Sequence, residues 1–196
     1  MLENGHYNVP PGKVAMVVTD LEMTTPQFRG VPCPDGLTFT TLSRDTTAYL
    51  ELFRRVGAPW LWFGRTLMDK QELTDILNDE KTGLFTLEKD GQAEALLELD
   101  FSVEGQCELD YFGLTPALIG SGAGAFLMDQ AIREAFDRGI KRFHLHTCTM
   151  DSPQALGFYQ RSGFTPIGRR IEIADDPRVA HGYDRDLAPH IPVIDP

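Results

Sequence analysis

Cysteines, basic residues and long apolar segments are all scarce in this sequence, and each scarcity excludes a class of protein. The three cysteines, Cys33, Cys107 and Cys148, form no CxxC pair, which argues against a disulfide framework or a zinc ribbon. No apolar run approaches the roughly 20 residues of a membrane helix. The first twelve residues also lack the basic and apolar regions of a signal peptide. We therefore expect a cytoplasmic protein that does not cross a membrane.

Acidic side chains dominate the charge. The 196 residues include 29 Asp and Glu against 18 Lys and Arg, for a net charge of −11. Proteins that bind nucleic acids draw affinity from Lys and Arg side chains that neutralise phosphates, so this balance argues against a nucleic-acid partner. Neutral or cationic partners fit it better.

Apolar spacing and turn residues predict a mixed order of helices and strands. Tight Lys-Asp-Gly and Val-Glu-Gly turns separate three short strands, which predicts an antiparallel meander. Strands are expected at 37–42, 84–88, 93–101, 107–114, 142–147 and 164–173, and helices at 46–56, 69–78, 124–138 and 152–162. Ser43 or Asp45 is expected to cap the first helix, and Ser152 with Pro153 to begin the last. The simplest matching architecture is α/β (α+β), a mixed, mainly antiparallel sheet with helices on both faces.

Composition divides the chain into three parts. Residues 1–36 form an N-terminal extension with one apolar stretch, Val14–Val18, as a candidate extra strand, followed by turn formers that indicate a long surface connection. Residues 37–173 hold the regular elements of one domain. Residues 174–196 are rich in turn formers and predict an irregular tail that packs on the surface or crosses to a partner subunit.

A glycine cluster at 120–124 precedes the third helix and leaves backbone N–H groups unobstructed at a helix N-terminus, an arrangement that binds anions such as a pyrophosphate. Close helix packing is the alternative reason for such glycines. Gly120, Gly122 and Ala125 also match a dinucleotide fingerprint. That fingerprint requires an acidic residue about 20 residues later, but 144–147 reads His-Leu-His-Thr, which argues against a nicotinamide or flavin enzyme.

Two motifs in this order resemble the GCN5-related N-acetyltransferase (GNAT) superfamily, over about 37–173. Gly122-Ala123-Gly124 resembles the family's pyrophosphate loop for acetyl-coenzyme A. The segment 155–164, ALGFYQRSGF, resembles the A-x-x-x-Y-x-x-x-G-F signature of the helix and strand that close the cofactor cleft. The resemblance implies a GNAT-like fold and acetyl-coenzyme A as cosubstrate, with no metal.

The resemblance also implies which residues bind the cofactor: Phe112, Gly113, Leu114, Ile119, Gly120, Ser121, Gly122, Ala123, Gly124, Ser152 and Ala155. Two departures weaken the match. Ile119 stands where the family usually has Gln or Arg, and Asp151 and Ser152 stand where it often has Asn.

Acetyl transfer to an amine needs a base, an oxyanion donor and an acid for the departing thiolate. Glu108 resembles the family's general base, Asp110 follows on the same strand face, and Glu98 is a weaker third candidate; solvated strand acids are the alternative reading. A backbone N–H at a bulge between Phe112 and Leu114 is a candidate oxyanion donor. Tyr159 matches the tyrosine that donates to the leaving sulfur, with ordinary core packing as its alternative.

Three side chains on one strand, His144, His146 and Cys148, suggest a zinc pair or a Cys-His nucleophile. Because no further ligand lies nearby and direct transfer needs no covalent intermediate, packing in the core or on a cleft wall is the preferred interpretation.

The acceptor pocket is expected at the aromatic segment 60–65, with Trp60, Trp62 and Arg65 as substrate-binding residues together with His146. Aromatic rings suit a cationic amine.

The resulting hypothesis is acetyl transfer from acetyl-coenzyme A to a primary amine, that of a small molecule, by direct attack in a ternary complex. Acetylation of a protein lysine or N-terminus is one alternative, and a non-catalytic acyl-coenzyme A-binding regulatory module is another. A homodimer is the expected assembly if the chain associates.

Overall fold

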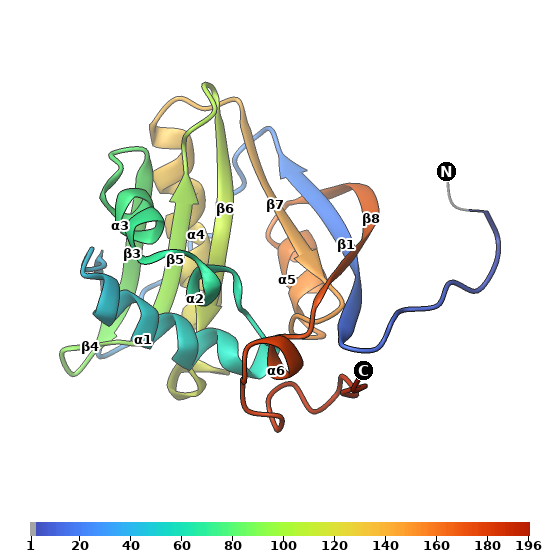
Figure 1. Ribbon diagram of the computed structural model, residues 1–196. Coiled ribbons are helices and arrows are strands. Elements are labelled where there is room, and N and C mark those ends of the chain that lie inside the picture. Colours follow the sequence, from blue (N-terminus) through green and yellow to red (C-terminus); the bar gives the residue numbers. More distant parts are fainter. Residues whose placement is uncertain (1–2) are drawn as a thin grey trace.

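A single sheet forms the centre of the molecule in the computed structural model, which describes residues 3–196 (Figure 1). The strands lie in the order β2-β3-β5-β6-β7-β1-β8, and the short β4 pairs with β3. Their bounds are β1 Lys13–Met23, β2 Leu37–Thr41, β3 Thr82–Lys89, β4 Gln92–Ala93, β5 Ala95–Asp100, β6 Gln106–Leu114, β7 Arg142–Cys148 and β8 Thr165–Asp175.

Helices cover both faces of this sheet (Figure 1). One face carries α1 (Thr46–Gly57), α2 (Gly64–Leu67) and α3 (Lys70–Asn78), the other α4 (Ala123–Asp137) and α5 (Ala155–Arg161), and α6 (Pro177–Ala180) lies in the C-terminal tail. The mixed, mainly antiparallel sheet with helices on both faces confirms the predicted fold class. Within the described residues, no helix combines the length and apolar character needed to cross a bilayer.

Side-chain caps explain where the helices begin. Asp45 Oδ1 accepts a hydrogen bond from the Ala48 N–H at 2.9 Å, which satisfies one free donor in the first turn of α1. The expected start of the last helix is wrong. The Ser152 hydroxyl lies 2.5 Å from Gln154 Oε1 in a turn before the helix, and α5 begins at Ala155.

The parallel neighbours β6 and β7 pair over a short distance. Gln106–Glu108 of β6 lies against Arg142–His144 of β7. Beyond these residues β6 continues to Leu114 and β7 to Cys148 without pairing to each other, and the two strands diverge (Figure 1). The unpaired ends open a cleft through the middle of the sheet.

The N-terminal strand β1 lies inside the sheet, although residues 1–36 were expected to be an extension. It pairs antiparallel with β7 on one side and β8 on the other. Val14, Val18 and Leu21 are buried. The observed strand, Lys13–Met23, is longer than the expected Val14–Val18. Its full length could not be predicted locally, because both strands that pair with β1 come from the C-terminal part of the sequence.

The segment 24–36 is the predicted surface connection. It is irregular and mostly exposed. Asp129 on α4 accepts hydrogen bonds from the backbone N–H groups of Arg29 at 3.2 Å and Val31 at 2.9 Å. A buried carboxylate therefore holds this connection against α4.

The C-terminal tail packs on its own chain. The Arg178 side chain is buried, forms an ion pair with Asp176 at 2.8 Å and donates to the carbonyl oxygens of Leu187 and Ile191. Leu187 and Ile191 also pack against the cluster that contains buried Leu61. The tail thus borders the segment that leads into α2.

Candidate active site

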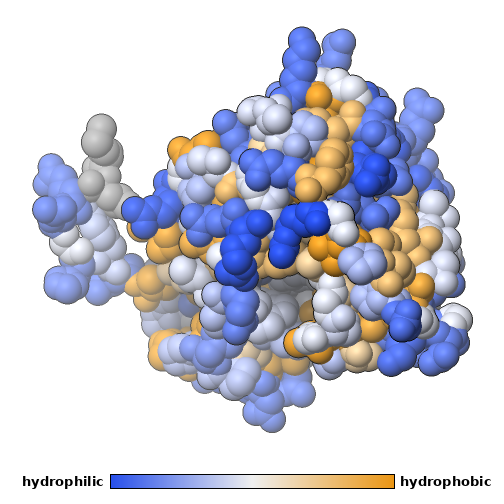
Figure 2. Space-filling view, turned by 180° about the vertical axis from the view of Figure 1, so that it is seen from behind, coloured by the Kyte–Doolittle hydropathy of each residue, from blue (hydrophilic) through white to orange (hydrophobic). Residues whose placement is uncertain are grey.

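A cleft of about 730 Å³ opens where β6 and β7 diverge. Its walls come from the end of β6, the turn before α4, the start of α5, the segment 60–64 and parts of β1 and β7. Seen from behind, the molecule is hollowed near the middle of this face (Figure 2). Pockets of this volume hold small molecules and cofactors.

The turn at one end of the cleft leaves alternate backbone N–H groups available. The N–H groups of Ser121 and Ala123 donate within the turn, whereas those of Gly120, Gly122 and Gly124 meet no acceptor in the described part of the chain. All three glycines line the cleft.

Backbone conformation explains why glycine stands here. Gly120 and Gly122 have φ values of +82° and +84°, and a Cβ atom on either would point into open space. Gly122 also caps α4, so the positive end of the helix dipole lies behind the free donors. These residues could hold a pyrophosphate.

Tyr159 on α5 lines the same cleft. Its ring packs against Phe112, Phe158 and Phe164, with centroids 5.6 to 6.3 Å apart. Burial is the main cause that raises the pKa of the phenol above its ordinary value, and the Asp151 carboxylate adds to it. The phenol therefore keeps its proton at neutral pH, as an acid toward a leaving group must.

A buried charge cluster lies at the other end of the cleft. Arg65 Nη2 donates to Glu98 Oε1 at 2.5 Å and to Asp110 Oδ2 at 2.9 Å. The Tyr49 hydroxyl donates to the second oxygen of Glu98. Glu98 is fully buried, so these donors satisfy a carboxylate that no water reaches.

Asp110 is the member of the cluster that lines the cleft. Burial, followed by the neighbouring Glu98 carboxylate, raises its pKa to about 7, against the opposing effect of Arg65. Among the described residues, no group donates to its second oxygen, Oδ1. A carboxylate with a pKa near the working pH has the proton affinity of an effective general base.

A β-bulge places this carboxylate. Glu98 and Leu99 of β5 pair with Tyr111 and Leu109 of β6, so Asp110 is the extra residue. The expected bulge between Phe112 and Leu114 is wrong, because the register there is regular.

Sequence reasoning missed Tyr111, which follows the extra residue. Its ring lines the cleft and packs against Trp62 at 5.4 Å and Phe53 at 4.8 Å. An acidic residue beside an aromatic one carried no signal of a bulge, since the pairing that creates it lies on β5.

Glu108, the first candidate for the base, does not line this cleft. It borders a second hollow of about 340 Å³ and lies 3.3 Å from His146 Nδ1. Its pKa is lowered, chiefly by the hydrogen bond with His146, and the same bond raises the pKa of His146. Among the three acids considered, the geometry therefore favours Asp110 over Glu108 at the cleft.

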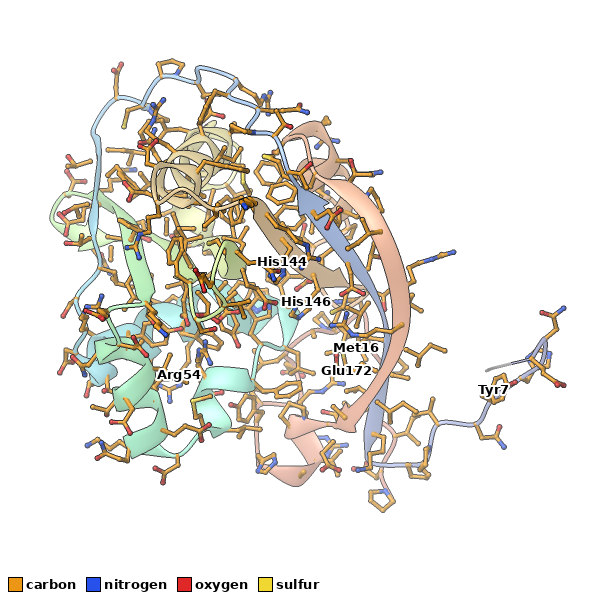
Figure 3. All side chains as sticks on the ribbon, turned by 90° about the horizontal axis from the view of Figure 1, so that it is seen from above. Tyr7, Met16, Arg54, His144, His146 and Glu172 are labelled. Carbon is orange, nitrogen blue, oxygen red and sulfur yellow. The ribbon has the colours of Figure 1, made fainter. Side chains whose placement is uncertain are left out.

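His146 borders both hollows. Figure 3 shows it between His144 and Met16 on one face of the sheet, with Glu172 of β8 nearby.

Burial, and after it the negative charge of Asp151, raises the pKa of Cys148, two residues after His146 on β7, to about 11. A thiol that remains protonated at neutral pH does not support the Cys-His nucleophile. In the described chain, no three His, Cys, Asp or Glu side chains are arranged to hold a metal ion.

Trp60 and Trp62 line the cleft where the acceptor pocket was expected, but Arg65 lies behind the wall, with 11% of its side chain exposed. The Trp62 indole N–H donates to Asp151 Oδ1 at 3.1 Å, which links this wall to the loop before α5.

Gly113 on β6 allows helix α1 to pack closely against the strand. A Cβ on Gly113 would lie 2.4 Å from Val56 Cγ1. Glycine therefore lets α1 approach β6.

Most of the expected site residues reach the cleft wall: Asp110, Tyr159, Phe112, Gly113, Leu114, Ile119, Gly120, Gly122, Gly124, Ser152, Ala155, Trp60, Trp62 and His146. Ser121 and Ala123 belong to the same turn but do not line the cleft, and Glu108 and Arg65 lie outside it as described above. Asp151 and Glu172 line it and were not expected to.

Comparisons with known proteins agree with this geometry. The model of the acetyltransferase (GNAT) family matches residues 48–164. No curated protein matches the sequence.

Several solved structures share the fold. A GCN5-related N-acetyltransferase from Sphaerobacter thermophilus is 16% identical, with a TM-score of 0.58 over 85% of this chain and 52% of that one. The ribosomal-protein-S18-alanine N-acetyltransferase of Escherichia coli is 17% identical, with a TM-score of 0.56 over 71% and 94%.

An aminoglycoside acetyltransferase from an uncultured soil metagenomic sample is 16% identical, with a TM-score of 0.55 over 66% of this chain and 88% of that one.

The present chain spans about half the length of the Sphaerobacter protein. These likenesses concern the fold, while the family match covers more than half of the sequence. The protein belongs to the acetyltransferase (GNAT) family.

Proposed function

We propose that this protein transfers the acetyl group of acetyl-coenzyme A directly to the primary amine of a small molecule. One observation carries the proposal. Three free backbone N–H groups, a buried phenol and a carboxylate whose pKa is about 7 all border one cleft. These are the anion cradle, the acid and the base that acetyl transfer requires.

The cradle would bind the pyrophosphate of the cosubstrate through the N–H groups of Gly120, Gly122 and Gly124. Ile119 offers no polar side chain there, so backbone donors supply the affinity. Acetyl-coenzyme A, when bound, supplies a thioester carbonyl and a thiolate leaving group. Ser152 and Ala155 would flank it on the α5 side of the cleft.

Asp110 would remove the proton that keeps the acceptor amine from reacting. An amine with a pKa of about 10.4 is neutral in about one molecule in a thousand near pH 7.4, a deficit of roughly 4 kcal/mol. The cleft-facing carboxylate of Asp110 is more than half ionised above pH 7. It therefore takes the proton without an additional base.

Tyr159 would donate a proton to the departing sulfur. The phenol is protonated at neutral pH because burial raises its pKa. Since a free thiol has a pKa of about 8.5, the thiolate leaves without excessive cost, and the tyrosine accelerates the step without being indispensable.

The acceptor would lie against Trp60, Trp62 and Tyr111, with Asp151 and Glu172 on the same cleft. Aromatic faces attract a cationic amine by about 0.5 to 2 kcal/mol, and the carboxylates add to this attraction. The lining therefore favours a cationic amine over a neutral or anionic acceptor.

The test is release of free thiol from acetyl-coenzyme A across a panel of small primary amines and of peptides with free N-termini or lysines. We expect small amines to support release. Activity with peptides alone would favour a protein acetyltransferase. Tight coenzyme A binding without release for any acceptor would favour the regulatory module. A burst of acetyl-enzyme that Cys148→Ala removes would instead establish a covalent route.

A further inference from the structure

The last strand of the sheet, β8, presents an open edge. It is eleven residues long, pairs only with β1 among the described strands, and is exposed along almost its whole length. Open strand edges carry unsatisfied backbone donors and acceptors that another strand can pair with. A long strand at a free edge therefore offers a place for a second chain.

The hydrogen-bond pattern shows which groups face outward. The Asp176 N–H donates to Gly12 O, just beyond the β1–β8 ladder. Opposed residues alternate between bonded and non-bonded pairs, so in this register Glu172 and Arg170 bond to β1. The backbone groups of Arg169, Ile171 and Ile173 consequently point away from the sheet.

An apolar patch accompanies this edge. Val17 of β1 lies opposite Ile171, and Ile173 follows on the same face of β8; their exposed fractions are 40%, 52% and 54%. Hydrophobic surface is visible on the side of the molecule where the N-terminal arm leaves the body (Figure 2). Apolar side chains beside open backbone groups are typical of a protein interface.

Charges along β8 select one way of pairing with a second copy. In an antiparallel pair of identical strands, a two-fold axis at Arg169, Arg170 or Glu172 would place like charges opposite each other. An axis at Ile173 would place Glu172 opposite Ala174, so that Glu172 would form no ion pair with Arg170. An axis at Ile171 places Arg170 opposite Glu172 twice and the two isoleucines in contact. The same register joins the outward backbone groups of Ile171 to each other and those of Arg169 to those of Ile173.

We propose that the protein forms a homodimer in which β8 pairs antiparallel with β8 of a second copy, with the two-fold axis at Ile171. The two sheets then form one continuous sheet, and the charged side chains that would block other registers stabilise this one. The occupant of the edge is a second copy of this chain because the strand is complementary to itself.

The dimer would also complete the cleft. Glu172 lines the cleft, and in this register Arg170 of the partner subunit lies opposite it. Within each chain Arg170 also forms an ion pair with Asp20. The N-terminal arm leaves the body on the side of β8 in two views (Figures 1 and 3), and Tyr7 on that arm is exposed. The arm is therefore placed to reach the second copy.

The first test measures the mass of the full chain in solution by light scattering during gel filtration. We expect twice the 21.9 kDa of one chain. Ile171→Arg places two cations on the axis and should give the monomer mass. Val103→Arg changes an equally exposed apolar residue in the turn between β5 and β6 and should remain dimeric. A monomeric wild type, or an Ile171→Arg protein that is folded and dimeric, would overturn the proposal.

The second test locates the axis by oxidation of cysteine variants in a Cys33→Ser background. Two cysteines at position 171 would lie about 5.5 Å apart between Cα atoms, within disulfide range. Two at position 17 would lie three strand spacings apart, about 14 Å. We expect a reducible dimer from Ile171→Cys and none from Val17→Cys. The opposite result, or no dimer from either, would overturn this register.

Charge reversal gives an independent check of the same register. Glu172→Arg alone should weaken the dimer at least tenfold, since it places cations opposite Arg170. Combining it with Arg170→Glu and with Asp20→Asn, which removes the carboxylate that pairs with Arg170 in its own chain, should restore the dimer, because the pairs between copies are then reversed. A triple variant whose dimer is no stronger than that of Glu172→Arg would contradict the Arg170–Glu172 pairing.

Discussion

The two ends of the cleft differ in the groups that form them, which are backbone N–H groups at one end and charged side chains at the other. At the pyrophosphate end, one continuous turn supplies backbone N–H groups at Gly120, Gly122 and Gly124. At the amine end, Arg65 of α2 donates to the carboxylates of both Glu98 on β5 and Asp110 on β6. One end depends on backbone conformation, and the other depends on charges brought together from distant parts of the chain.

This difference indicates how each end fails. A backbone site tolerates changes of polar side chains but not an added Cβ atom that strains a residue with positive φ. A side-chain site tolerates backbone adjustment but not the loss of a charge partner in a buried cluster. Substitutions at the two ends should therefore change different measured quantities.

The largest effect is expected for Asp110→Asn, which removes the base and leaves the cradle intact. We expect kcat/KM to fall about 10² to 10⁴-fold, while the affinity for coenzyme A measured by calorimetry stays near the wild-type value. Glu108→Gln is the matched variant on the same strand and should retain activity close to that of the wild type. The assignment of the base would be refuted if Glu108→Gln lost more activity than Asp110→Asn.

Tyr159→Phe should cause the second-largest loss of activity. The variant keeps the aromatic packing and loses the proton donor, so kcat should fall about ten- to a hundredfold without a change in coenzyme A affinity. Tyr7→Phe in the exposed N-terminal segment removes a hydroxyl outside the cleft and should leave kcat unchanged. Equal kcat for wild type and Tyr159→Phe would assign this tyrosine to packing alone.

Gly122→Ala tests the pyrophosphate end of the cleft, which depends on backbone conformation. Forcing alanine into φ +84° costs about 1 to 2 kcal/mol, and relaxation of the turn should weaken coenzyme A binding by about five- to thirtyfold. Gly139→Ala imposes the same strain at φ +77°, after α4 and away from the cleft. It should lower the melting temperature without changing affinity. Equal losses of affinity in both variants would mean that strain, not the cradle, is responsible.

The smallest effect is expected for substitutions of Arg65, which should change the pH dependence of kcat/KM. Wild-type kcat/KM should rise with pH and level off above about pH 7, because Asp110 must lose its proton. Arg65 lowers the pKa of Asp110, so Arg65→Gln should move this rise to higher pH, with a loss that is greatest below pH 7. Arg65→Lys retains the charge and should keep the wild-type profile. An Arg65→Gln profile with an unmoved rise, in a protein shown to be folded by circular dichroism, would contradict the role of the cluster.

The same contrast explains how much the sequence could predict. The Asp45 cap, the glycine turn and the strands of the meander depend on neighbouring residues, and their positions were predicted closely. The place of β1 inside the sheet depends on strands from the far end of the chain. That placement could not be predicted from local spacing.

The choice between Asp110 and Glu108 shows the same limit within the site. Both are strand acids two residues apart, and local sequence does not distinguish them. The bulge against β5, the approach of Arg65 from α2 and the burial of Glu98 separate their environments. Each of these is a tertiary contact. Burial and the Glu98 carboxylate raise the pKa of Asp110 against the opposing effect of Arg65, whereas the hydrogen bond with His146 lowers the pKa of Glu108.

A crystal structure of the protein with coenzyme A would test the central claim most directly. We expect the pyrophosphate oxygens within hydrogen-bond distance of the N–H groups of Gly120, Gly122 and Gly124, and the sulfur beside the Tyr159 hydroxyl on the side of the cleft that faces Asp110. Coenzyme A bound elsewhere, or with its pyrophosphate away from this turn, would contradict the account.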